Sequence, residues 1–460
     1  MKKRMCKIMA LAMTAAMVVP MAAQTTAFAA DDKEITYWNI AVESPDKDIV
    51  TAAVDKFNKE TESGYTVNSV AIQNDTYKEK LVIAMSSGEC PDMYSSWSGG
   101  PMYEYIDSGF AQPIDDLLDQ SDIKDKLLDA AIEQGSYKGH VYAIPYMNVV
   151  LAGIFYNKDM FKQYGLEEPK TLADLENICA TLKENGITPF ALANASKWTG
   201  SMYFMSLAAR YGGLEPFQNA VAGTGKFTDD CFIKAGEKIQ EWVKNGYFPD
   251  GVNSLSEDDG QAKQLMYQET AGMLLCGSWY TGTFQTDSEE FYQKIGWFPF
   301  PAIDDSDADP TIQIGTVGDQ FISFNCEGDK LAAAFECAAD HLSDEVEDMI
   351  YSTGKIAPVK DAGDHIKDPV VKEIFDAAQE ASSIQLWYDQ YLPTSVATAH
   401  LDGLQEVFGL TKTPQEAQEE MQTAMDEYLS TKSDSGAADD TAEEATDDAA
   451  ADDAAADDAE

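Results

Sequence analysis

The segment that begins ITYWN (35–39) and ends DMYSS (92–96) changes its apolar spacing four times. Residues 35–39 are typical of a strand, apolar residues recur at helical spacing over 49–57, and residues 65–72 again favour a strand. A second helical pattern covers 77–85, and the strand at 92–96 leads into a glycine-rich loop. Strands that alternate with helices in this way predict an α/β lobe with parallel strand pairing.

A second lobe of the same kind is expected further along the chain. Apolar strand-like runs flank Pro145, and Thr171 with Asp174 forms a capping box ahead of a helix, which residues 187–192 follow as a strand. The stretch 298–310 contains Pro, Asp and Ser and is expected to be a linker or a crossing between lobes. Later elements are expected as a strand at 320–325, a helix at 330–342, and a helix from the capping box at 413–416 to about residue 429.

The first 30 residues have the pattern of a secretory signal. Four basic residues within the first seven precede an apolar run over 8–23, and the small residues of 27–30 are suited to cleavage. The run is shorter than a bilayer span and contains Pro20, which disfavours a permanent transmembrane helix. Cys6 precedes the run, which is not the position of a lipidated cysteine. The mature chain is therefore expected outside the cytoplasm, as a secreted, cell-surface-associated or periplasmic protein.

The composition indicates a globular and strongly acidic protein. Of its 460 residues, 44% are hydrophobic and 10% aromatic, and the formal net charge is −48. Residues 433–460 are dominated by Asp, Glu and Ala and contain no Lys or Arg, so we expect a disordered acidic tail. The remaining length is sufficient for two domains with cores. Because this charge repels phosphate groups, nucleic-acid binding is excluded and anionic ligands are disfavoured.

Several short segments occur in the order that one known family shows. They include Tyr77-Lys78-Glu79-Lys80-Leu81, Ser96-Trp97-Ser98-Gly99-Gly100, Phe155-Tyr156-Asn157-Lys158-Asp159, Gly186-Ile187-Thr188-Pro189-Phe190, Gly277-Ser278-Trp279 and Phe298-Pro299-Phe300-Pro301. On this shared order, residues 34–430 resemble the extracellular sugar-binding proteins of ABC importers, the group of maltose- and multiple-sugar-binding proteins.

The resemblance implies an α/β, two-lobed periplasmic-binding-protein fold, type II-like, with a hinge and a central ligand cleft. The N-terminal lobe would comprise 34–148 plus 304–355, and the C-terminal lobe 149–303 plus 356–431. The lobes would close over a sugar, expected to be a neutral oligosaccharide, and the closed form would deliver it to the membrane permease of an ABC transporter.

Tryptophans are the first candidates for ligand contacts, because sugar rings present apolar C–H faces that stack on flat aromatic surfaces. The resemblance places Trp97 and Trp279 in the cleft. Trp387 and Trp198 are further candidates, and Trp38 at the end of the first strand faces either the cleft or the core. For Trp97 the alternative role is packing in a loop. The remaining tryptophans fall in apolar patterns and are expected in the core: Trp242 and Trp297.

Polar candidates are Asn39, Asn148, Asp319 and Asp389, since a planar carboxylate or amide determines which sugar hydroxyls fit. Their alternative role is turn formation or helix capping.

Two other functions are compatible with parts of the sequence. A glycoside hydrolase needs two convergent carboxylates, but any pair can be chosen among 80 acidic residues, and a complete Gly-x-Ser-x-Gly pattern is lacking. A binding protein for a cation such as a polyamine would use the same aromatics and an acidic cleft. The six cysteines after residue 30 lack metal-ligand spacing, and their pairing stays open. We therefore expect a monomeric sugar receptor without catalytic residues, metal or cofactor, with the cation binder as the alternative.

Overall fold

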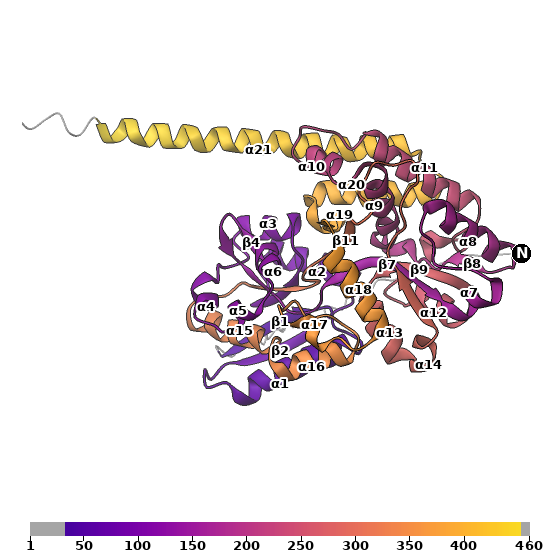
Figure 1. Cartoon of the computed structure of the whole chain (residues 1–460). Coiled ribbons are helices and arrows are strands. Elements are labelled where there is room, and N and C mark those ends of the chain that lie inside the picture. The colour runs from indigo at the N-terminus through magenta and orange to yellow at the C-terminus, as the bar shows by residue number, and fades with distance from the viewer. Residues whose placement is uncertain (1–32, 452–460) are drawn as a thin grey trace, which may run out of the picture.

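The computed structural model describes residues 33–451, with side chains to residue 432, and shows two α/β lobes that each contain a β-sheet (Figure 1). The predicted signal sequence, 1–30, and residues 452–460 of the predicted tail lie outside the described residues. Within the described range, no helix combines the length and the apolar character that a membrane span requires.

The first lobe contains a five-stranded sheet in the order β2-β1-β3-β12-β6. Its strands are β1 (Glu34–Asn39), β2 (Thr66–Ala71), β3 (Met93–Ser96), β6 (Ala143–Pro145) and β12 (Phe321–Phe324). β1 pairs in parallel with β2 and β3, which confirms the predicted alternation, whereas β12 runs antiparallel to β3 and β6. Because β12 comes from far along the chain, this lobe is discontinuous in sequence.

Helices cover the first sheet and bury one apolar stripe each. Ile49, Val50, Val54 and Phe57 form the buried stripe of the first helix, at the spacing that the sequence predicts. The helices of this lobe are α1 (Asp46–Glu60), α2 (Asn74–Ser87), α3 (Gly100–Asp107), α4 (Asp115–Asp119), α5 (Ile123–Lys126), α6 (Asp129–Gln134), α15 (Gly328–Asp340) and α16 (Asp344–Ser352), and a small hairpin joins β4 (Ser136–Tyr137) to β5 (His140–Val141).

The second lobe contains a sheet in the order β13-β11-β7-β9-β8, with β10 also paired to β7. Its strands are β7 (Val150–Asn157), β8 (Thr188–Phe190), β9 (Ala271–Gly277), β10 (Ile295–Phe298), β11 (Gln313–Thr316) and β13 (Ile384–Gln385). The whole of β7 is buried. A side chain at Gly153 would place its Cβ 2.3 Å from the Trp297 ring, so the glycine leaves space for this indole. Trp297 is buried in the core, as the sequence predicts.

The helices of the second lobe include the one with the predicted capping box. Thr171 and Asp174 make the reciprocal hydrogen bonds of that box at the start of α8. Trp242 of α11 is fully buried and donates to Glu176 Oε1 over 2.9 Å, which confirms its place in the core. The helices are α7 (Lys158–Tyr164), α8 (Leu172–Glu184), α9 (Trp198–Gly212), α10 (Glu215–Val221), α11 (Asp230–Lys244), α12 (Gln261–Tyr267), α13 (Tyr280–Asp287), α14 (Glu289–Tyr292), α18 (Pro369–Glu380), α19 (Tyr388–Tyr391), α20 (Thr394–Phe408) and α21 (Pro414–Ala451). Two 3₁₀ turns, η1 (Asn194–Ser196) and η2 (Val252–Ser254), belong to the same lobe. The short helix α17 (Ala362–His365) lies in the segment between α16 and α18.

The chain crosses from the second lobe back to the first later than the sequence predicts. Residues 304–316 were expected in the first lobe, but β11 pairs with β7 and β13 of the second sheet. The reason is the buried Arg210 guanidinium, which donates to the carbonyl of Phe300 over 2.9 Å and to that of Ile312 over 2.7 Å. These bonds hold the proline-containing stretch on the second lobe, so the crossing falls between β11 and β12.

The last helix, α21, is longer than predicted. Its capping box is present, since Thr413 N–H donates to Glu416 Oε2 over 2.9 Å and Glu416 N–H donates to Thr413 Oγ1 over 3.2 Å. The helical backbone then continues to Ala451, although residues 433–451 were expected to be disordered. Alanine has the highest helix propensity, and extension of a helix that has already started costs less than starting a new one.

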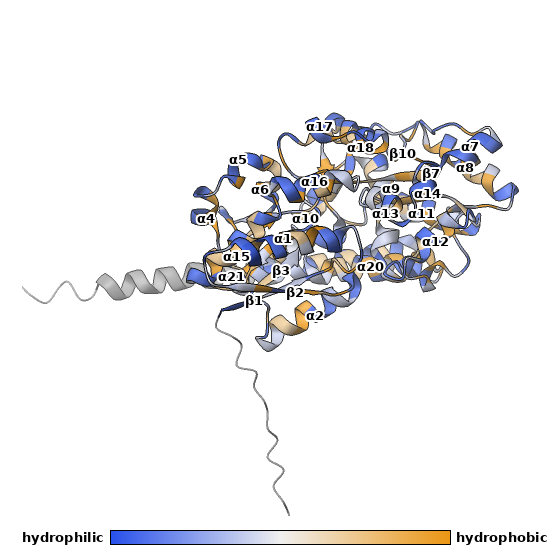
Figure 2. Cartoon of the chain, turned by 90° about the horizontal axis from the view of Figure 1, so that it is seen from below, coloured by the Kyte–Doolittle hydropathy of each residue, from blue (hydrophilic) through white to orange (hydrophobic). Residues whose placement is uncertain are grey.

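The lobes share one large apolar core system, and large apolar side chains at the surface are few among the described residues. On α2, Val82 and Ile83 are exposed. Figure 2, coloured by hydropathy, shows this helix at the edge of the molecule. Tyr77 and Leu81 form the buried face of the same helix and pack beneath β3 residue Tyr94. The buried face of α2 therefore anchors the helix that contributes Asn74 and Lys78 to the cleft described next.

Candidate ligand-binding site

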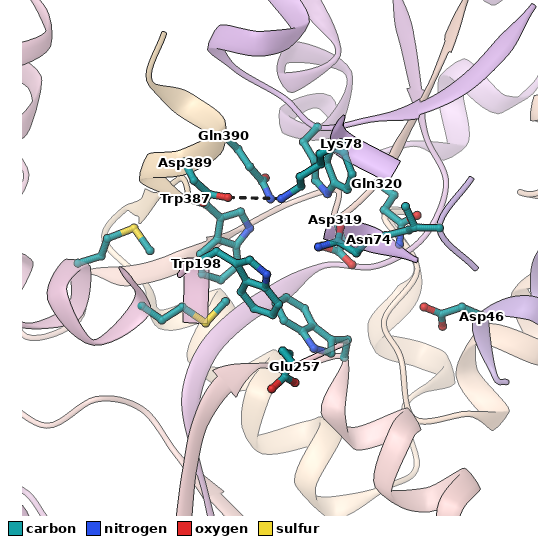
Figure 3. A pocket seen from close by; sticks show the side chains of 15 residues that line it. Asp46, Asn74, Lys78, Trp198, Glu257, Asp319, Gln320, Trp387, Asp389 and Gln390 are labelled. Atoms are coloured by element: carbon teal, nitrogen blue, oxygen red, sulfur yellow. Dashed lines mark ion pairs between the residues drawn. The ribbon is translucent and has the colours of Figure 1, made fainter. Parts of the chain in front are cut away.

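A cavity of about 190 Å³ lies between the two lobes (Figure 3). The first lobe contributes residues from the β1–α1 segment, α2 and the segment after β3. The second lobe contributes residues from α9, α19, the segment before α12 and the segments that follow β9 and β13, and the crossing segment between β11 and β12 contributes two more. The lining residues are Ile40, Asp46, Asn74, Lys78, Trp97, Trp198, Met202, Met205, Glu257, Trp279, Asp319, Gln320, Trp387, Asp389 and Gln390.

Three tryptophans of the second lobe form one wall of this cavity. Trp198 begins α9, Trp279 follows β9, and Trp387 follows β13, so the ends of three elements bring them together. The Trp279 ring centroid lies 5.9 Å from that of Trp198 and 6.1 Å from that of Trp387, with interplanar angles of 62° and 66°. These are edge-to-face contacts, which aromatic rings prefer over face-to-face sandwiches. The three rings therefore form one apolar surface in which neighbouring ring planes are steeply tilted relative to each other.

A glycine and a neighbouring ring determine where two of the indoles in the cavity lie, one from each lobe. A Cβ at Gly277 would come within 2.0 Å of the Trp279 ring, so only glycine leaves space for the indole there. Trp97 enters from the first lobe, where its ring packs edge-on against Tyr77 at 6.0 Å and Lys78 Nζ lies 4.9 Å from its centroid. The cavity thus has aromatic surfaces from both lobes.

Asp319 and Gln320 lie on the segment that crosses between β11 and β12. The Asp319 N–H donates to the carbonyl of Asn148 over 2.7 Å, and Gln320 Oε1 accepts the hydroxyl of Tyr146 over 2.7 Å. Burial raises the pKa of Asp319 to about 7, against the opposing effect of the Lys355 ammonium, while the Asp46 carboxylate adds to the increase. A carboxyl group of this kind can either donate or accept a hydrogen bond at neutral pH.

Glu257 is a second carboxyl group with an altered affinity for protons. Burial raises its pKa to about 7, although the Tyr280 hydroxyl donates to Glu257 Oε1 and stabilises the charged form. Figure 3 shows Glu257 beyond Trp198, on the side of the cavity away from Asp389.

The other two carboxylates that line the cavity are paired with lysines. Lys78 of the first lobe lies 3.6 Å from Asp389 of the second, an ion pair that joins the lobes across the cavity (Figure 3). Asp46 pairs with Lys355, whose side chain is 1% exposed. Of the four carboxyl groups that line the cavity, two are therefore paired with lysines and two have a raised pKa.

Further contacts hold the lobes together around the cavity. The Asp75 N–H of the first lobe donates to Asp258 Oδ2 of the second over 3.1 Å, and Trp198 Nε1 donates to Asp75 Oδ1 over 3.3 Å. Thr394 donates to Glu104 through its N–H over 3.0 Å and through its hydroxyl over 2.6 Å. The structure therefore represents a state in which the lobes are in contact.

Six of the nine residues that the sequence proposes line this one cavity. They are Trp97, Trp198, Trp279, Trp387, Asp319 and Asp389.

The other three candidates lie elsewhere in the described structure. Trp38 packs beside the cluster of Tyr77 and Tyr94 in the first lobe. Asn39 Oδ1 accepts the N–H of Ala41 over 3.0 Å, the turn-forming role that was its alternative. Asn148 Oδ1 accepts the N–H of Ile356 over 2.9 Å, so its amide joins two segments that connect the lobes.

Several lining residues were missed by the sequence analysis. Gln320 and Gln390 directly follow predicted site residues, and this adjacency was the available signal. Asp46 lies in the first turn of α1. Acidic residues are common there because they interact favourably with the helix dipole, so this position alone did not indicate a function. Glu257 lies in an acidic stretch that resembles a solvated turn. The remaining lining residues without a prediction are Ile40, Asn74, Lys78, Met202 and Met205.

Comparison with known proteins identifies one family for this chain and solved structures with a similar fold. The family model described as bacterial extracellular solute-binding protein matches residues 41–339. An uncharacterized ABC transporter extracellular-binding protein, PH1214, of Pyrococcus horikoshii is 31% identical over 49% of this chain and 50% of its own length. A maltotriose-binding protein of Pyrococcus abyssi is 28% identical over 52% of this chain and 48% of its own. The chain therefore spans about half the length of these curated relatives.

A solved structure, described in connection with xylan utilization by the thermophilic bacterium Caldanaerobius polysaccharolyticus, matches almost the whole fold. Its TM-score is 0.78 at 29% identity, and the match covers 85% of this chain and 99% of that one.

Proposed function

Because the chain belongs to the bacterial extracellular solute-binding protein family, we propose that it captures a neutral sugar between its lobes and delivers it to an ABC transporter permease. The observation that carries this proposal is the wall of Trp198, Trp279 and Trp387, which Trp97 faces from the other lobe as a lining residue of the same cavity.

An indole wall beside polar groups suits the two surfaces of a sugar. Burial of roughly 100 Å² of sugar face against one indole contributes about 2.5 kcal/mol. Asn74, Gln320 and Gln390 provide amides from the first lobe, the crossing segment and the second lobe, respectively. A ligand that contacts all three would favour the closed arrangement of the lobes over the open one.

The charges in the cavity favour a neutral ligand over a polyamine. Asp389 is paired with Lys78 and Asp46 with Lys355, so neither needs a cation from the ligand. Asp319 and Glu257, with a pKa of about 7 each, carry only part of their negative charge at neutral pH. Lys78 also occupies the position over Trp97 that a ligand cation would take in a cation–π contact.

The relatives support an oligosaccharide as the ligand. The names of several refer to sugars, among them the maltotriose-binding protein and the multiple sugar-binding protein of Streptococcus mutans, and the solved structure above is described in connection with xylan. By this proposal the chain is a non-enzymatic, monomeric receptor that acts outside the cytoplasm after cleavage of its signal, and its partner is a membrane permease.

A thermal-unfolding screen tests the proposal. The whole chain is heated with neutral mono- and oligosaccharides and, in parallel wells, with polyamines. A ligand at 100 times its dissociation constant stabilises the folded state by about 2.7 kcal/mol, a readily measured shift. Stabilisation by a sugar supports the proposal. Stabilisation by a polyamine and by none of the sugars would refute it.

A further inference from the structure

The cavity with the tryptophans adjoins a second one. A neighbouring cavity of about 460 Å³ shares four lining residues with it, namely Ile40, Asp46, Glu257 and Trp279. The β1–α1 segment of the first lobe, 40–46, forms one side of the second cavity, and residues 257–263 with 279–283 of the second lobe form the other. Trp279 therefore lies at the border of two adjoining cavities between the lobes.

The opposite end of the tryptophan cavity is closed by backbone packed against backbone. A Cβ at Gly99 would lie 2.2 Å from the carbonyl oxygen of Gln390, and one at Gly100 would lie 2.3 Å from that of Leu392. Beyond this contact, Thr394 donates two hydrogen bonds to Glu104. A ligand that fills the first cavity can therefore extend past Trp279 but not toward α3.

The second cavity differs in chemistry from the first. Trp279 and the largely buried Tyr280 are its aromatic side chains among the described residues, and Tyr280 uses its hydroxyl on Glu257. Small apolar residues such as Val42 and Pro45 also line it, together with hydrogen-bonding side chains such as Gln73, Asp259 and Thr283.

The single lysine that lines the second cavity is already neutralised within the described structure. Lys263 Nζ lies 3.0 Å from Asp287 of its own lobe and 3.5 Å from Glu43 of the first lobe. Glu43, Asp258 and Asp259 line the same space, so a negatively charged group on the ligand would meet carboxylates there.

From these observations we infer that the site binds a linear, neutral oligosaccharide end-on. One terminal unit lies among Trp198, Trp279 and Trp387, and the following units pass Trp279 into the second cavity, where hydrogen bonds replace stacking. This inference rests on the proposed function and names its substrate class: chains that continue beyond the tryptophan cavity and carry no uronic acid there.

Titration calorimetry with two homologous series tests the inference. The whole chain is titrated with β-1,4-xylo-oligosaccharides and with malto-oligosaccharides of one to five units. In the series that binds, we expect the affinity to rise at least ten-fold from the monosaccharide to the longer chains. A uronic acid substituent beyond the terminal unit should lower the affinity at least ten-fold. Equal affinity for the monosaccharide and the pentasaccharide, or unchanged affinity for the acidic chain, would overturn the inference and leave the sugar-receptor proposal intact.

Two variants locate the gain from chain length. Gln73→Ala removes an amide from the second cavity, and Thr283→Phe reduces the space in it, while neither residue lines the first cavity. We expect at least one of them to weaken pentasaccharide binding three-fold or more and to change monosaccharide binding less than two-fold. The matched control is Thr76→Ala, an exposed residue on α2 that lines neither cavity and should change neither affinity.

The outcomes separate the two claims. Variants that weaken both ligands equally, or neither, would overturn the end-on arrangement although a sugar binds. If no oligosaccharide of either series binds and none stabilises the chain in the thermal screen, the proposed function fails and this inference fails with it.

Discussion

Replacement of Trp279 by alanine tests the aromatic wall at its centre. Its ring lies about 6 Å from those of both Trp198 and Trp387, and it lines both cavities, so every position of a ligand proposed above contacts it. Loss of roughly 100 Å² of stacked apolar surface costs about 2.5 kcal/mol of binding free energy. This corresponds to a dissociation constant that increases about 70-fold, and at least ten-fold if a neighbouring indole moves to cover part of the gap.

The assay is titration calorimetry with the sugar that stabilises the wild-type chain most. Trp38→Ala is the matched control, because Trp38 packs in the first lobe and does not line the described cavity. It should keep the wild-type affinity even if it lowers the unfolding temperature. The reasoning is refuted if Trp279→Ala binds the sugar as tightly as the wild type, or if both variants lose affinity equally while unfolding curves without ligand show both to be folded.

Three further predictions follow from the charges and contacts of the cleft. Because burial raises the pKa of Asp319 to about 7, the folded state holds this proton more tightly than the unfolded chain, so the unfolding free energy falls as the pH rises from about 4 to about 7. Asp319→Asn should therefore match the wild type near pH 4 and exceed it increasingly up to pH 7 in thermal unfolding; a constant difference would contradict this. Gly99→Ala, with its Cβ 2.2 Å from the Gln390 carbonyl, should hold the lobes apart, and small-angle scattering with saturating sugar should then give a larger radius of gyration than for the wild type. Glu104→Ala removes two hydrogen bonds from Thr394 and should weaken sugar binding two- to ten-fold, mainly through faster dissociation in stopped-flow measurements.

The regular parts of the fold were predictable because long elements repeat their pattern several times. The buried stripe of α1 and the capping box of α8 follow from residue type and spacing, and both are present as expected. The short strands β11 (four residues) and β13 (two residues) were missed, since they contain too few alternations to be recognised. The position of the crossing depends on Arg210, whose contacts with carbonyls about 100 residues away have no local signal.

The site was predictable where a residue type has few alternative uses. Six candidates line the cavity, four of them tryptophans. Acidic residues gave a weaker signal, because a carboxyl group that lines the cavity, such as that of Glu257, cannot be distinguished by sequence from the rest of the 80 acidic residues. What distinguishes Glu257 is burial beside Tyr280, which depends on how two distant segments pack.

Asn148, which the sequence proposes as a ligand contact, makes hydrogen bonds between segments that connect the lobes. It lies on the segment between β6 and β7, where the chain first passes from one sheet to the other. Its side-chain oxygen accepts the N–H of Ile356, on the segment that leads from α16 toward α18. Its backbone carbonyl accepts the N–H of Asp319, on the segment that crosses between β11 and β12. One asparagine therefore joins three segments that connect the lobes, and because Asp319 also lines the cavity, a ligand that contacts its carboxyl group acts one hydrogen bond away from the hinge.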